Sequence, residues 1–186
     1  MIFAFEKPSE GALTLLSALI HESGHFLYSY LFLNEWRIPL GRLNGFKMKK
    51  SSLISYGHEL CLYLSGPVAN LLADAAALPF FVASGGFARD FLIINSLTMA
   101  SNLLPVEGYD GYGVLMTLAS AHNAEGAARR VLRCVSFVFI ALLSLLSLYF
   151  MYYLNSGYWI YVIFTVSLLS FMKKALKMQK SRFQEI

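Results

Sequence analysis

Long hydrophobic blocks separated by short polar segments dominate this 186-residue chain. Five blocks are long enough, or nearly long enough, to span a bilayer, which takes about 20 apolar residues in a helix. They cover approximately residues 11–33, 60–83, 87–104, 131–154 and 158–172. The third and fifth blocks are short and would need tilt, local thinning of the bilayer or burial by neighbouring helices. The pattern predicts an all-α membrane protein with about five transmembrane helices.

The segment that joins the first two blocks, at about residues 36–55, has a different character. It contains Pro39, Gly41 and Gly45, and its apolar positions partly alternate around Leu43. Alternation between turn residues is typical of a β-hairpin. We therefore expect a short membrane-associated β-hairpin here, and a plain solvated loop fits the pattern equally well.

Composition and charge strengthen the membrane prediction and orient the chain. The sequence is 57% hydrophobic and only 14% charged, whereas soluble domains are about 25% charged. Of the 15 Lys and Arg residues, 13 follow block one, precede block four or follow block five. With five spans these segments share one side, which the positive-inside rule assigns to the cytoplasm. We expect the N-terminus outside, the C-terminus inside, and a basic tail that touches anionic lipids rather than nucleic acid.

The first block carries ionisable residues that the membrane normally excludes. His21, Glu22 and His25 form an H-E-x-x-H pattern. On a helix, residues i and i+4 share a face, so both imidazoles can reach one zinc ion. Glu22 is adjacent and can take a proton from an attacking water without being a ligand. A hydrogen-bonded cluster without metal is the structural alternative.

Catalytic zinc usually has three protein ligands, so a third residue is needed. Asp110 and Glu107 follow block three, just after Pro105, which should break the helix. Asp74 lies inside block two, four residues after Asn70, and on a helix these two side chains share a face. Spacing alone favours Asp110 only modestly over Glu107 and Asp74.

Three elements together resemble the site-2 protease family of intramembrane zinc metalloproteases. They are the H-E-x-x-H pattern, the stretch Ser65-Gly66-Pro67-Val68-Ala69-Asn70, and Asn102-x-x-Pro105 followed by Asp110-Gly111. They occur in the family's order, one on each of three core helices, and the resemblance covers about residues 10–120. Glu107 and Tyr109 depart from the family's apolar, proline-rich residues before the aspartate.

The resemblance implies a role for each matching residue. His21, His25 and Asp110 would bind Zn²⁺, Glu22 would act as general base and acid, and Asn70 and Asn102 would contact substrate backbone or the oxyanion. It implies a catalytic core over residues 1–120 that includes the hairpin segment, then two C-terminal helices and a basic tail over residues 121–186. No PDZ or cystathionine-synthase-like domain is expected.

The resemblance also implies partners and a location. The substrate would be a membrane-anchored protein, such as the precursor or inhibitor of a transcriptional regulator, with a regulatory membrane protein as a further partner. The location would be a bacterial cytoplasmic membrane, with the site toward the cytoplasmic side. The rival function is a membrane zinc transporter or other non-enzymatic metal-binding protein that uses the same side chains.

Overall fold

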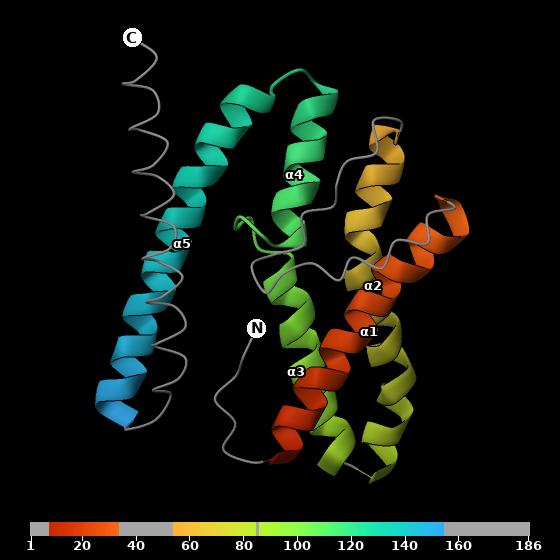
Figure 1. Ribbon diagram of the computed structural model, residues 1–186. Helices are drawn as coiled ribbons and strands as arrows, with labels where there is room; N and C mark the ends of the chain where they lie inside the picture. Colours follow the sequence, from red (N-terminus) through yellow and green to blue (C-terminus); the bar gives the residue numbers. More distant parts are fainter. Residues whose placement is uncertain (1–7, 34–53, 85, 155–186) are drawn as a thin grey trace. The chain divides into compact units, whose positions relative to one another are not determined.

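The computed structural model describes residues 8–33, 54–84 and 86–154, and this part of the chain is entirely helical (Figure 1). Its helices are α1 (Pro8–Phe32), α2 (Tyr56–Ser84), α3 (Gly86–Asn102), α4 (Asp110–Ala121) and α5 (Glu125–Leu154). The all-α prediction is confirmed for these residues. The predicted hairpin, except for its last two residues, and the fifth hydrophobic block lie outside the described residues.

The chain divides into two compact units, and the larger one holds every residue of the candidate site. It comprises Phe5–Leu132, and the other unit comprises Met1–Ala4 and Arg133–Ile186. Within the larger unit, α2 contacts α1, α3 and α4, and α1 also contacts α3. Helix α2 is therefore the element against which the rest of this bundle is assembled.

Two of the described helices are long and apolar enough to cross a membrane. These are Tyr56–Phe80 of α2 and Glu125–Tyr149 of α5. Helix α3 has only 17 residues, and α1 carries the ionisable cluster in its second half. Length and composition alone therefore support a membrane location through two helices.

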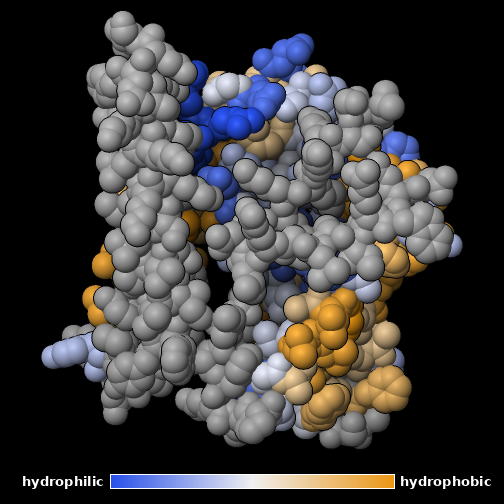
Figure 2. All heavy atoms as spheres, viewed as in Figure 1, coloured by the Kyte–Doolittle hydropathy of each residue, from blue (hydrophilic) through white to orange (hydrophobic). Residues whose placement is uncertain are grey.

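Many polar side chains are buried among the described residues, beside a smaller set of buried apolar ones, and many large apolar side chains are exposed. The largest fully buried side chains are Asn70, Asn95, Ser17 and Ser136. Large apolar residues lie on the surface instead, for example Leu72, Phe80 and Phe87, which are 65–70% exposed. Figure 2 shows a hydrophobic area over the lower half of α1, and hydrophilic residues near the turn between α4 and α5. Buried polar side chains in this number, together with large exposed apolar ones, differ from the mainly apolar interior of water-soluble domains.

The chain breaks between α3 and α4, as the proline after block three predicted. Helix α3 ends at Asn102, and α4 begins at Asp110. Pro105 lies in the break, and Gly108 adopts a φ of +105°, a conformation that residues with a side chain rarely adopt. The sequence did not predict the second helix, because Asp110-Gly111-Tyr112-Gly113 contains two glycines, which are poor helix formers.

A small residue on α1 lets α1 and α2 approach closely. A Cβ atom on Gly24 would overlap the Ser65 carbonyl oxygen and come within 2.7 Å of the Ala69 Cβ. Glycine at this crossing therefore sets the distance between the two backbones, and this distance determines which α2 groups the next residue, His25, can reach.

Candidate metal centre

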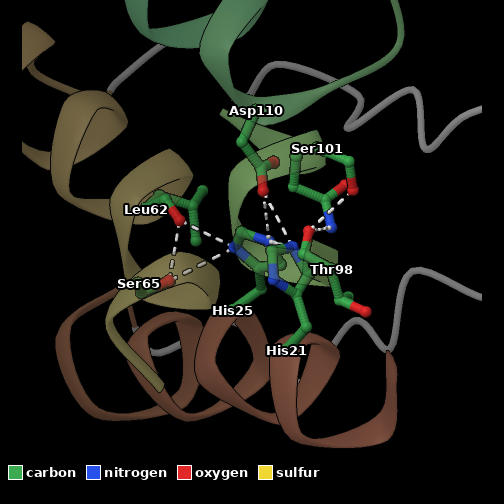
Figure 3. Close-up of polar contacts among 8 residues, drawn as sticks. His21, His25, Leu62, Ser65, Thr98, Ser101 and Asp110 are labelled. Carbon is green, nitrogen blue, oxygen red and sulfur yellow. Dashed lines mark hydrogen bonds and ion pairs between the residues drawn. The ribbon is translucent and has the colours of Figure 1, made fainter. Parts of the chain in front are cut away.

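Three predicted ligands converge at the centre of the larger unit. His21 and His25 come from α1, and Asp110 is the first residue of α4. The Nε2 atom of His21 lies 2.8 Å from Asp110 Oδ2, and Nε2 of His25 lies 3.2 Å from the same oxygen. The two Nε2 atoms are 3.2 Å apart. The side chains of His21 and Asp110, 89 positions apart in the sequence, thus converge with His25 on one site (Figure 3).

The second ring nitrogen of His25 is fixed by the backbone of α2. Its Nδ1 lies 2.8 Å from the Leu62 carbonyl oxygen. Because a carbonyl can only accept, Nδ1 carries the proton and the Nε2 lone pair of the neutral ring is free to bind a metal. The Ser65 hydroxyl donates to the same carbonyl at 2.7 Å and lies 3.2 Å from Nδ1. A backbone carbonyl behind a histidine is a common partner of metal-ligating imidazoles.

The triangle formed by these donor atoms fits a tetrahedral ion. With metal–ligand distances near 2.0–2.1 Å, two ligands of a tetrahedral site lie about 3.3 Å apart. The three edges here measure 2.8, 3.2 and 3.2 Å. In the neutral tautomer, His25 Nε2 and Asp110 Oδ2 are both acceptors at 3.2 Å and would repel each other. A cation bound by both atoms would remove that repulsion, so the residues fit a metal ion.

A glycine of α2 leaves the space beside both Nε2 atoms open. A Cβ atom on Gly66 would collide with Nε2 of His25 and would come within 2.7 Å of Nε2 of His21. This glycine belongs to the Gly66-Pro67 pair singled out in the sequence. The absence of a side chain at this position is a requirement of the site.

The structure distinguishes among the three acidic residues that competed for the third ligand position. Asp110 lies at the first turn of α4, where the helix dipole favours a negative charge. Glu107 is exposed in the preceding turn. Asp74 instead accepts hydrogen bonds from Asn95 Nδ2 and Ser96 Oγ of α3, both at 2.8 Å. Among the described residues, the group that could hold a metal ion is His21, His25 and Asp110.

Glu22 lies beside this group without belonging to it. It is half-buried on α1, and its carboxylate is close enough to interact electrostatically with His21, His25 and Asp110. It therefore lies near the triad but is not part of the group whose atoms could hold one metal ion.

Neither of the two asparagines predicted to bind substrate is hydrogen-bonded to the triad in this structure. Asn102 donates from Nδ2 to the Thr98 carbonyl of its own helix at 3.0 Å. Asn70 is fully buried, and neither Oδ1 nor Nδ2 has a hydrogen-bond partner. Its backbone carbonyl accepts a hydrogen bond from Asn95 Nδ2 at 2.8 Å.

Several buried or site-adjacent polar residues had no predicted role. Ser17 and Asn95 are fully buried, and Ser65 lies behind His25. Ser17 precedes His21 by four positions and so shares its helix face, a signal visible in the sequence. The polar pair Asn95-Ser96 interrupts a hydrophobic block, and such residues usually face a partner. Their partners belong to other helices, so the sequence could not name them.

Comparison with known proteins adds no family assignment. A scan against models of protein families matched none, and a search of curated proteins found no significant relative. The geometry of the site therefore carries the functional argument.

Proposed function

We propose that this chain is an intramembrane zinc metalloprotease that cuts peptide bonds in or near transmembrane segments of membrane-anchored proteins. The observation that carries the proposal is the convergence of His21, His25 and Asp110, with Glu22 beside them. Two imidazoles and one carboxylate are the donor set of a hydrolytic zinc site that keeps a coordination position open, and the adjacent glutamate is available as a general base.

The exposed large apolar side chains and the buried polar groups support a location in the bilayer. Lipid solvates apolar side chains, whereas polar groups must find partners inside the bundle. The proposal keeps five spans, with the N-terminus outside and the C-terminus in the cytoplasm, from the distribution of Lys and Arg. The segment at residues 36–55 would lie at the membrane surface, where an unwound substrate could add as a strand.

The proposed chemistry is hydrolysis of an amide by water. A zinc ion at the triad would polarise the scissile carbonyl and bring the pKa of a coordinated water near neutrality. Glu22 takes a proton from the attacking water as the C–O bond forms, and it delivers that proton to the leaving nitrogen as the C–N bond breaks. His25, fixed by Leu62, and Asp110, fixed at the start of α4, keep their donor atoms in place throughout.

The substrate-binding part of the proposal rests on Asn70 and Asn102. Each amide offers a donor and an acceptor, which matches the one N–H and one C=O of a peptide group. In this proposal they hold the unwound strand or stabilise the oxyanion. A substrate helix must first unwind, because its carbonyl groups are otherwise occupied by helical hydrogen bonds.

The test compares the native chain with Glu22→Gln. Each is co-expressed with a panel of single-span membrane proteins, and the cleavage products and the zinc content of the purified chain are measured. We expect Glu22→Gln to lose cleavage by at least 100-fold, in line with the loss of a general base, and to keep its zinc. Glu10→Gln, the same change on the same helix outside the site, should cleave normally.

Cleavage that persists in Glu22→Gln would contradict the catalytic assignment. The rival function, a zinc transporter, predicts that zinc flux across proteoliposomes depends on His21 and Asp110 and that no substrate is cleaved. Measuring flux and cleavage on the same preparations separates the two functions.

A further inference from the structure

The two histidines of the triad differ in what lies behind them. Nδ1 of His25 is bonded to the Leu62 carbonyl. Nδ1 of His21 is buried and has no hydrogen-bond partner. If Nε2 of His21 binds a metal, Nδ1 of the neutral ring carries a proton. A buried N–H group of a metal-ligating histidine almost always donates to a carboxylate, a carbonyl or a water.

The residue one helical turn before His21 carries a matching unpaired group. Ser17 is 0% exposed, and its hydroxyl also has no hydrogen-bond partner. Side chains at i and i+4 lie on one face with Cβ atoms about 5–6 Å apart. Helical side chains lean toward the N-terminus, so we expect the His21 ring to lie over the turn that contains Ser17. That spacing suits one bridging water better than a direct bond.

Helices α2 and α3 contribute further buried polar groups, the side-chain amides of Asn70 and Asn95. Together with the Ser17 hydroxyl, these groups are called the polar layer below. His25 contacts Leu62 and His21 lies against Gly66, so α1 and α2 run in opposite directions. From this antiparallel register, one turn further along each helix, we expect Ser17 of α1 to lie at the level of Asn70 of α2. Asn70 is fully buried with both amide atoms unpaired.

The orientation of the Asn95 amide is set by its neighbours. Its Nδ2 donates both hydrogens, one to the Asn70 carbonyl and one to Asp74 Oδ1, each at 2.8 Å. Because both partners accept, Oδ1 must occupy the other amide position, and it is buried without a partner. The unpaired groups of Ser17, His21, Asn70 and Asn95 thus include both hydrogen-bond donors and acceptors. A cation would satisfy only the acceptors, whereas water satisfies both.

We propose that Ser17, with the amides of Asn70 and Asn95, holds a buried water that accepts the Nδ1–H of His21. Ser17 is then a positioning residue of the metal centre, and the water does for His21 what the Leu62 carbonyl does for His25. The inference rests on the proposed metal site. In the chain without substrate, the Asn70 amide belongs to this polar layer.

The test measures zinc affinity of the full chain in detergent by competition with a chelator. We expect Ser17→Ala to weaken zinc binding by roughly 10- to 100-fold, as loss of an outer partner of a ligating histidine does. Ser17→Thr keeps the hydroxyl and should restore most of the affinity. The matched control is Ser23→Ala on the same helix, because Ser23 is exposed and donates to the Ile20 carbonyl.

A second readout detects the water directly. In the zinc-loaded chain labelled with ¹⁵N-histidine, His21 Nδ1–H should show magnetisation transfer from water, and this signal should fall in Ser17→Ala. His25 Nδ1–H, bonded to a carbonyl, should show far less transfer. Native affinity in Ser17→Ala, or equal water transfer to both rings, would overturn the inference alone. Failure of the native chain to bind zinc would overturn the metal site as well.

Discussion

At the scale of single residues, the chemistry depends on which carboxylate completes the metal site. The sequence offered three candidates, and the structure brings only Asp110 to the two imidazoles. The difference arises because Asp110 begins α4, whereas Glu107 lies in the turn before it.

We therefore predict that Asp110→Asn abolishes stoichiometric zinc binding, because a neutral amide replaces the only anionic ligand. Glu107→Gln should bind zinc like the native chain, since it removes an equal charge three residues away. The zinc content of the two purified variants, measured by mass spectrometry, shows whether Asp110 or Glu107 is the third ligand. The opposite pattern would transfer the ligand role to Glu107.

A second prediction at this scale concerns the space beside the imidazoles. Gly66→Ala places a methyl group against both Nε2 atoms. We expect it to weaken zinc binding by at least the roughly 10- to 100-fold seen when support of a metal site is lost, while the helix itself becomes no less stable. Chelator competition measures the change. Gly57→Ala is the matched control on α2, because its nearest neighbour, the Ser55 hydroxyl, lies 3.9 Å from the added Cβ.

At the scale of the elements, the first three helices largely follow their hydrophobic blocks. The sequence predicted helices over residues 11–33, 60–83 and 87–104, and the structure has Pro8–Phe32, Tyr56–Ser84 and Gly86–Asn102. Apolar runs of this length predict helices because buried strands are usually only about four to eight residues long. Helix α4 was not predicted, since two glycines in its first turn weaken its local preference for a helix.

Those glycines are explained by contacts that a sequence cannot reveal. A Cβ on Gly111 would collide with the Leu103 carbonyl, and one on Gly113 would collide with the Tyr63 ring. Tertiary packing of α4 therefore requires the residues that lower its intrinsic helix propensity. This packing also places Asp110, and for this reason the spacing alone could not identify the third ligand.

The crossing of α1 and α2 gives a prediction for an element contact. Gly24→Val adds a branched side chain against Ser65 and Ala69. Overpacking of this kind costs about 1–3 kcal/mol, and it should also move His25 away from Leu62. We expect a lower thermal midpoint in detergent together with weaker zinc binding. Gly126→Ala in α5, where a Cβ meets nothing within 4 Å, is the control. An unchanged midpoint in Gly24→Val would show that this crossing does not set the helix separation.

At the scale of the whole molecule, the proposed topology rests on the positions of 13 Lys and Arg residues. It assigns the start of α1 to the outside and the turn between α4 and α5 to the cytoplasm.

The topology predicts opposite labelling of two introduced cysteines. In a chain whose native Cys61 and Cys134 are replaced by alanine, Ser9→Cys should react with a membrane-impermeant maleimide in intact cells. Ala124→Cys should react only after the cells are permeabilised. Labelling of both in intact cells, or the reverse pattern, would contradict the proposed orientation.

The most direct test of the central claim is X-ray absorption at the zinc edge on the full chain loaded with one equivalent of zinc. The account predicts two imidazole nitrogens and light oxygen ligands at about 2.0–2.2 Å, with no sulfur near 2.3 Å, and loss of this spectrum in His21→Ala and Asp110→Asn. A sulfur ligand from Cys61 or Cys134, or a native spectrum retained in both variants, would contradict it.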